Sequence, residues 1–306
     1  MSKSAKYALS DKIIDKVSEL SEMIGNLKEL SGERIVIKCG GELMDDENFL
    51  ESLGNDIAIL RTLGISVVVV HGAGSQVDRV LAKLKIKNDF FDGYRITDSA
   101  TIEVVEMALT GLINKNFVKY LLKHEVNCIG LSGKDNNLIT AKKIRRTQKD
   151  EGSNIERIID LGFIGDPADI NLEFFEDLLD NADLVPVISP IAFDKSFNTF
   201  SINADVLACY IAENIKATKV IIMSENYNIK SKDGIINGHI KPSDVNRLIE
   251  NTTDYKMILR LKASVNALKN GVEAVHIISS EDKHSLLAEL SSLNDTTSGI
   301  VICDNK

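Results

Sequence analysis

The sequence has no long hydrophobic run, and its longest candidate, residues 65–70, includes Ser66 and has only the length of a strand. A membrane-spanning helix needs about 18 to 20 consecutive apolar residues, so no membrane segment is predicted. The N-terminal segment also lacks the apolar core of a signal peptide, which argues against secretion.

The chain also has few cysteines and no excess of positive charge. Its four cysteines form no CxxC pair and show no zinc spacing, which favours reduced, mostly buried thiols and predicts no protein-ligated metal. They are Cys39, Cys128, Cys209 and Cys303. A formal net charge of −9 argues against a nucleic-acid-binding protein, although a nucleotide substrate needs only a few local cations. We therefore expect a cytoplasmic protein without nucleic-acid or membrane partners.

Runs rich in Val and Ile alternate with segments of helical periodicity along most of the chain. The predicted strands are 34–38, 65–71, 127–131, 184–189, 219–223, 274–279 and 299–303. The predicted helices are 48–63, 75–84, 99–113, 203–215, 242–250 and 256–270. Most of the strands are continuously apolar, as in strands that are covered on both faces. The alternation predicts an α/β fold with a largely parallel sheet, whose ligands bind at the carboxyl ends of the strands.

Three segments depart from this alternation. Residues 142–170 and 228–240 are predicted to form hairpins. The first thirty residues predict an amphipathic helix, with Ser10 as its N-cap and Gly25 as a weak point or kink. This helix either packs on the flank of its own domain or bridges two subunits. Its apolar stripe consists of Ile13, Val17, Leu20, Ile24 and Leu27.

Two glycine-rich turns follow the first two predicted strands. Lys38 ends the first strand and precedes Gly40 and Gly41, a combination of a cation with exposed backbone N–H groups that suits a phosphate. Residues 71–76, HGAGSQ, lead from the second strand into a helix whose N-terminus also offers donors. The alternatives are a surface lysine beside two unrelated tight turns, and His71 is more easily explained as a structural histidine than as a base.

Other polar residues are weak signals when each is taken alone. Arg95 could clamp a carboxylate, but a surface salt bridge is the simpler explanation. Asp205 could equally be an ordinary acidic residue in the first turn of a helix. Residues 130–135 do not complete a phosphate-binding P-loop, and residues 71–76 lack the third glycine of a dinucleotide-binding motif.

In order, the motifs KxGG, HGxGxQ, GxRxTD, GLSGKD, DLGFIG, VIxPI and INAD resemble the amino-acid kinase superfamily, and within it the acetylglutamate kinases. The resemblance is close over residues 34 to about 215. It implies an open three-layer αβα sandwich with a mainly parallel sheet. Residues 31–197 would bind the acyl-amino acid, residues 198–306 would bind ATP and Mg²⁺, and residues 1–30 would form a possible oligomerisation arm.

The resemblance also implies a role for each matching residue. Lys38 would stabilise the transferring phosphoryl group, Asp205 would orient the catalytic cations, and Arg95 would clamp the α-carboxylate of the substrate. The remaining residues are implied to bind one of the two substrates. They are Gly72, Ala73, Ser201 and Asn203 for the acceptor and Gly40, Gly41, Ser224 and Lys256 for the nucleotide.

The chain departs from the family pattern mainly in its nucleotide half. Residues 224–228 contain no glycine where the family has a glycine-containing loop, and Arg260 stands where the family has a lysine. In the acceptor half, Ala73 replaces a glycine and Ser201 replaces an asparagine. Arg260 keeps the positive charge with a different geometry, so we expect it to be catalytic.

The resemblance implies phosphoryl transfer from ATP to the side-chain carboxylate of N-acetyl-L-glutamate, a step of arginine biosynthesis. The alternatives are a regulator that binds an acyl-amino acid without catalysis, and a kinase for another acidic amino-acid derivative. Arginine is a possible effector, because His276 matches a family position near the effector site. The helix before the first strand implies a homodimer or, through residues 8–30, a hexameric ring.

Overall fold

The computed structural model describes residues 11–149, 156–231, 234–292 and 297–304. Its central element is an eight-stranded sheet with the strand order β16-β18-β17-β13-β1-β2-β10-β5. All neighbouring strands are parallel except β17 and β18, so the sheet is mainly parallel, as predicted. The strands are β1 (Arg34–Cys39), β2 (Ser66–His71), β5 (Cys128–Ser132), β10 (Val185–Ser189), β13 (Lys219–Met223), β16 (Gly238–Ile240), β17 (Ala274–Ile278) and β18 (Ile300–Cys303).

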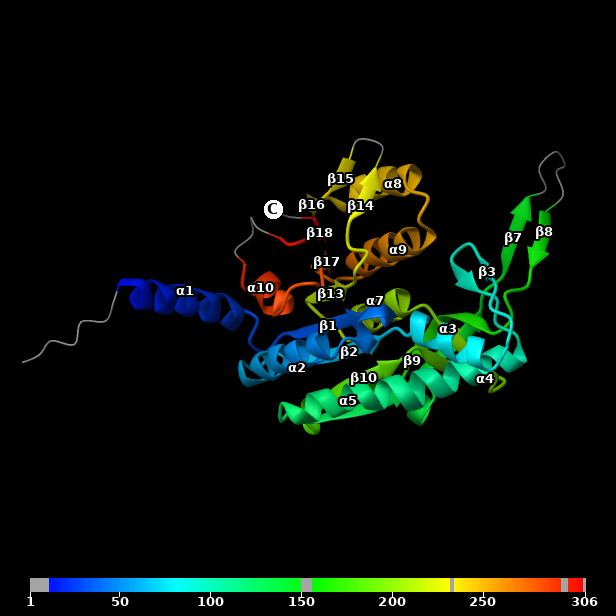
Figure 1. Cartoon of the computed structure of the whole chain (residues 1–306), viewed down its shortest axis with the longest axis horizontal. Coiled ribbons are helices and arrows are strands. Elements are labelled where there is room, and N and C mark those ends of the chain that lie inside the picture. The colour runs from blue at the N-terminus through cyan, green and yellow to red at the C-terminus, as the bar shows by residue number, and fades with distance from the viewer. Residues whose placement is uncertain (1–10, 150–155, 232–233, 293–296, 305–306) are drawn as a thin grey trace, which may run out of the picture.

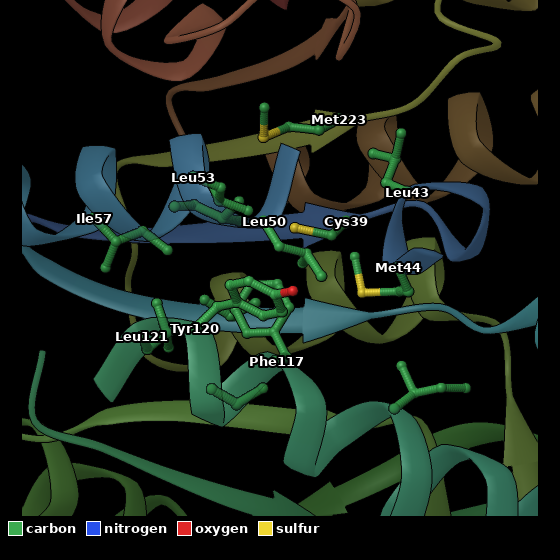
Figure 2. Packing of buried hydrophobic residues seen from close by; sticks show 14 of the residues in the cluster. Cys39, Leu43, Met44, Leu50, Leu53, Ile57, Phe117, Tyr120, Leu121 and Met223 are labelled. Carbon is green, nitrogen blue, oxygen red and sulfur yellow. The ribbon is translucent and has the colours of Figure 1, made fainter. Parts of the chain in front are cut away.

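The central strands are apolar because both of their faces are buried. In β1, Ile35 and Ile37 belong to one hydrophobic core and Val36 to another, and β2 alternates between the two cores in the same way. Successive side chains of a strand point to opposite faces, so a continuous apolar run supplies two cores at once. Figure 2 shows the first core, in which residues of α2 and α5 pack over β1 and β2.

Helices cover both faces of the sheet and make three layers, which confirms the predicted sandwich (Figure 1). The first face carries α2 (Glu47–Thr62), α3 (Gly74–Lys83), α4 (Ser99–Glu106), α5 (Asn114–Lys123) and α10 (Ser285–Ser291). The second face carries α6 (Leu172–Glu176), α7 (Ala204–Asn214), α8 (Pro242–Asn251) and α9 (Tyr255–Lys269). The helix predicted over residues 99–113 continues through a π-helical stretch, Met107–Ile113, directly into α5.

Smaller sheets lie outside the central sheet. The described parts of both predicted hairpin segments contain antiparallel pairs, β7 (Arg146–Lys149) with β8 (Glu156–Ile159) and β14 (Ile229–Ser231) with β15 (Gly234–Ile236). Four strands close into a small barrel that joins residues from both predicted halves. They are β6 (Ile139–Lys143), β9 (Ile164–Ile170), β11 (Ile191–Phe193) and β12 (Thr199–Ile202). A short hairpin, β3 (Phe90–Phe91) and β4 (Tyr94–Arg95), carries Arg95.

The N-terminal helix α1 (Asp11–Lys28) extends from one end of the molecule (Figure 1). It is unbroken across Gly25, and the predicted N-cap Ser10 lies outside the described residues. Of its apolar stripe only Leu27 is buried, whereas Ile13, Val17, Leu20 and Ile24 are exposed. Asn26 ties the helix to α10 by donating from Nδ2 to the carbonyl of Ser291 at 2.6 Å. No helix among the described residues is long and apolar enough to span a membrane.

Candidate active site

A cavity of about 400 Å³ opens at the carboxyl ends of β1, β2 and β13, beside the first turns of α3, α7 and α9. This is the edge at which parallel α/β sheets place their ligands. All of the predicted site residues except Gly40 line it. They are Lys38, Gly41, Gly72, Ala73, Arg95, Ser201, Asn203, Asp205, Ser224, Lys256 and Arg260.

Asp205, in the first turn of α7, lies between two buried cations. Its Oδ1 is 2.7 Å from Nζ of Lys38, and its Oδ2 is 3.0 Å from Nε of Arg260. Lys38 reaches it because its side chain leaves β1 on the face that α7 and α9 cover. Burial would raise the pKa of Asp205, but Arg260 and Lys38 outweigh it and hold the pKa at about 2. The carboxylate is therefore charged and orients both cations toward the cavity.

The two glycine-rich turns lie against each other, as expected if they serve one anion. A Cβ atom at Gly41 would lie 2.5 Å from the backbone nitrogen of Gly74 and 2.7 Å from that of Ala73, so only glycine allows this approach. Gln76 fixes the pair by donating from Nε2 to the carbonyl of Gly41 at 2.7 Å. The sequence contained this glutamine in the HGAGSQ motif but gave no reason to assign it a partner.

The backbone donors in these turns are divided between the sheet and the cavity. Gly40 donates its N–H to the carbonyl of Met223 at 3.0 Å, and Gly72 donates to the carbonyl of Cys39 at 2.9 Å. These two N–H groups extend the hydrogen bonding of the sheet and are not directed at a ligand. The cavity is instead lined by Gly41, Ala73 and Gly74, whose nitrogens converge where the turns meet.

Two of the three helices that begin at the cavity, α3 and α7, are capped differently. Ala73 is the N-cap of α3 and has no side chain to accept from the first turn. At α7, Oδ1 of the N-cap Asn203 accepts from the N–H groups of Asp205 at 2.9 Å and Val206 at 3.1 Å. The uncapped start of α3 is thus the one with backbone donors and a positive dipole end to offer an anion. Asn203 is tied into its own helix through its carbonyl oxygen.

Arg95 lies at the junction of this cavity with a neighbouring one of about 370 Å³. Its Nη2 is 2.7 Å from Oδ1 of Asp78, its Nη1 donates to Oδ1 of Asn88, and its guanidinium lies over the ring of Phe90. Ser201 and Lys256 also line both cavities. The guanidinium is thereby held in one orientation, and its contact with Asp78 is a salt bridge of the kind that the sequence offers as the simpler explanation of Arg95.

The loop after β13, which has no glycine, is held by side chains. Arg260 donates from Nη1 to the carbonyl of Asn226 at 2.6 Å and from Nη2 to Oγ of Ser224 at 3.3 Å. Ser224 Oγ in turn donates to Oε1 of Glu42 at 2.9 Å. Sequence reasoning missed Glu42, whose neighbour Gly41 was recognised, because its partner is 182 residues away in the chain.

His71 is buried beneath the second glycine turn and is a structural residue. Its Nε2 is 3.2 Å from Nδ2 of Asn114 and 3.3 Å from Oγ of Ser189. Burial lowers the pKa of His71 to about 4, so the ring is neutral. It does not line the cavity, which confirms the structural explanation over a catalytic base.

A separate cavity of about 530 Å³ lies at the opposite edge of the sheet, near the amino ends of β13 and β17. His276 lines it, and Nδ1 of this histidine is 2.8 Å from Oε1 of Glu289 on α10. Glu289 also accepts from the hydroxyl of Thr297 at 2.8 Å and from the N–H of Ser298 at 3.1 Å.

Fold and site together define an α/β protein whose cleft is lined by two glycine-rich turns and by two cations on one aspartate. A sequence model of the amino acid kinase family matches residues 33–279, and the chain belongs to this family. Among its relatives, the acetylglutamate kinase of Ehrlichia ruminantium (strain Gardel) is 38% identical over 286 residues, which span 92% of this chain and 88% of the relative. The acetylglutamate kinase of Rhodospirillum centenum is 38% identical over 276 residues and 90% of both chains.

Solved structures show the same fold at lower identity. N-acetylglutamate synthase from Neisseria gonorrhoeae, complexed with coenzyme A and N-acetyl-glutamate, aligns with a TM-score of 0.80 at 22% identity. The alignment covers 95% of this chain and 64% of that chain. Carbamate kinase from Giardia lamblia bound to AMP-PNP aligns with a TM-score of 0.60 at 15% identity, over 90% of this chain and 99% of that chain.

Proposed function

We propose that the protein transfers the γ-phosphoryl group of ATP to the side-chain carboxylate of N-acetyl-L-glutamate. The observation that carries this proposal is the arrangement of Lys38 and Arg260 on the two oxygens of Asp205, beside two interlocked glycine turns. Relatives that are 38% identical to this chain over about nine tenths of its length are named acetylglutamate kinases, which supports this choice of substrates.

The residues of the cavity suit phosphoryl transfer to a carboxylate. An ionised carboxylate is already a nucleophile, so one of its oxygens bonds to phosphorus as the bond to ADP breaks, and no general base is required. Lys38 is placed to offset the charge that spreads over the transferring group. The N–H groups of Gly41, Ala73 and Gly74 would hold the phosphoryl oxygens, and Arg95 would fix the α-carboxylate of the acceptor.

The charge balance of the cavity supports ATP complexed with Mg²⁺ as the donor. Four basic side chains line the cavity, and four acidic side chains balance them. They are Lys38, Arg95, Lys256 and Arg260 against Glu42, Asp205, Glu225 and Asp254. The lining therefore supplies no net positive charge to a triphosphate. A divalent cation that arrives with the nucleotide would supply it.

The test is a coupled assay of ADP release with a panel of acceptors. We expect release with N-acetyl-L-glutamate and Mg²⁺, and none without Mg²⁺. Release with only L-glutamate, L-aspartate or another acidic derivative would establish a kinase for a different acceptor. Binding of N-acetyl-L-glutamate by calorimetry without ADP release would establish the non-catalytic regulator. This alternative is favoured by the hydrogen bonds that all three guanidinium nitrogens of Arg260 make to protein groups.

The cavity near His276 supports a second proposal, that of arginine as an effector. Glu273 lines it and could pair with a guanidinium group. Addition of L-arginine to the same assay tests this proposal, and unchanged rates at millimolar arginine would contradict it.

The cytoplasmic location of the protein and its assembly into a homo-oligomer stay predictions from the sequence.

A further inference from the structure

Glu42 has no role in the chemistry described so far, yet it connects the two substrate-binding halves. It follows the first glycine turn, in the short 3-10 helix Gly41–Asp45. Its Oε1 accepts from Oγ of Ser224 at 2.9 Å and lies 3.4 Å from the backbone nitrogen of Glu225. Both donors belong to the loop after β13, so Glu42 holds this loop from the side of β1.

The first glycine of the turn makes room for this carboxylate. A Cβ atom at Gly40 would lie 2.2 Å from Oε1 and 2.5 Å from Cδ of Glu42. Gly40 does not line the cavity, and its N–H is donated to Met223. The space above Gly40 is thus used by a side chain of the protein itself.

The loop depends on such contacts because it has no glycine to shape its backbone. Ser224 is 2% exposed and is the centre of the network. Its Oγ donates to Glu42 and accepts from Nη2 of Arg260 at 3.3 Å and from the N–H of Asn226 at 3.2 Å. Glu42 and Arg260 therefore both hold Ser224, one as acceptor and the other as donor.

The carboxylate of Glu42 is charged in this position. Burial would raise its pKa, but hydrogen bonds from the backbone and from Ser224, together with Lys38, outweigh burial and lower it. An ionised carboxylate is a stronger acceptor than a neutral group, so the contact with Ser224 is a charge-assisted hydrogen bond.

We propose that Glu42 is a positioning residue that, together with Arg260, fixes the loop at Ser224–Asn226 for the nucleotide and takes over the role that glycines have in a glycine-containing loop. Glu42 acts through Ser224 and transfers no proton or phosphoryl group. The proposal rests on the proposed function only in assigning the nucleotide to this side of the cavity. Glu42, which belongs to the acceptor half, is thereby given a role in the affinity for the nucleotide.

The test compares Glu42→Ala with Glu42→Gln, because glutamine keeps an oxygen that can accept from Ser224. Hydrogen exchange of the segment 219–231 in the nucleotide-free protein reports the order of the loop directly. We expect faster exchange in Glu42→Ala and near-normal exchange in Glu42→Gln. The dissociation constant of Mg²⁺–AMP-PNP, measured by calorimetry, is expected to rise about tenfold in Glu42→Ala, and much less in Glu42→Gln.

Glu225→Gln is the matched control for charge. It removes a negative charge from the same loop but keeps the backbone N–H that points at Glu42, so its exchange is expected to match the wild type. Binding of N-acetyl-L-glutamate is expected to change less than about twofold in Glu42→Ala, because the role concerns only one substrate.

Several results would overturn the proposal. Unchanged exchange in Glu42→Ala would show that the loop does not depend on this residue. Tighter nucleotide binding in both Glu42 variants would mean that the carboxylate competes with phosphate instead of positioning the loop. Absence of nucleotide binding by the wild type would also refute it. Nucleotide binding without phosphorylation of N-acetyl-L-glutamate would refute only the proposed acceptor, and the exchange and affinity measurements would still decide the role of Glu42.

Discussion

The two sides of the cleft hold their loops in different ways. At β1 and β2 the turns are held mainly by backbone contact, since Gly41 approaches Ala73 and Gly74 more closely than any side chain allows, and one side-chain hydrogen bond, from Gln76, is added. At β13 the loop is held by side chains, since Ser224 is bonded to both Glu42 and Arg260. Loss of a glycine motif therefore does not imply loss of an ordered loop. Here the loop is ordered by Glu42 and Arg260, which lie far from it in the sequence.

The largest effect is expected from the cation on the acceptor side. Lys38→Met should lower kcat by about three orders of magnitude or more, because this charge acts on the transition state more than on the bound substrates. The affinity for the acceptor, measured by calorimetry, and the circular dichroism spectrum should stay close to those of the wild type. The assay of ADP release measures kcat. Activity within a few-fold of the wild type would remove Lys38 from the phosphoryl site.

Arg95 tests whether the acceptor half binds only the acceptor. Arg95→Ala should raise the KM for the acidic acceptor about 100-fold, a typical loss for a charge-assisted contact, and leave the KM for ATP within a few-fold. Initial rates with each substrate varied in turn give both constants. If the KM for ATP rose instead, the assignment of the two halves would have to be exchanged.

Acid is expected to weaken the fold through the buried His71. Burial lowers the pKa of His71 to about 4 from an ordinary value of 6.5, so the unfolded chain takes up a proton near 6.5 that the folded chain does not. The stability due to neutral His71 is present above pH 6.5 and is lost as the pH falls toward 4, by up to about 3 kcal/mol.

Denaturant unfolding of the wild type and of His71→Gln between pH 7 and pH 4 measures this contribution. The variant should lose less stability over that range, because glutamine does not titrate. Asp205 should add little over this range, since its pKa falls from an ordinary value of 3.8 to about 2 on folding and both values lie below pH 4. Parallel curves for the two proteins would contradict a buried, neutral His71.

Arg260→Lys tests the side-chain network of the nucleotide half. Lysine keeps the positive charge, but it cannot bond Asp205, Ser224 and the carbonyl of Asn226 through a planar group. We expect the KM for ATP to rise about tenfold, with a smaller change in the KM for the acceptor. An unchanged KM for ATP would show that charge alone is sufficient at this position.

The sequence predicts the central sheet well because its strands are buried on both faces. The runs at 34–38 and 65–71 therefore show an apolar signal that needs no tertiary information. The site residues are recognisable because glycine turns and a lysine at a strand end are local features. Glu42 and Gln76 could not be assigned in this way, since their partners, Ser224 and the carbonyl of Gly41, are brought to them only by the fold.

The smallest effect on activity is expected from the N-terminal helix. Ile13, Val17, Leu20 and Ile24 form an exposed apolar stripe on α1, and a surface of this kind calls for a partner. We predict that the main domain forms a dimer and that α1 joins dimers into a larger ring. Deletion of residues 1–28 should then give a dimer with kcat within about twofold of the full chain, because the cleft residues are all retained. Light scattering on both proteins measures the assembly.

Equal masses for the two proteins would mean that the helix does not bridge subunits. A truncated protein that is inactive would show instead that α1 supports the cleft, through Asn26 and α10.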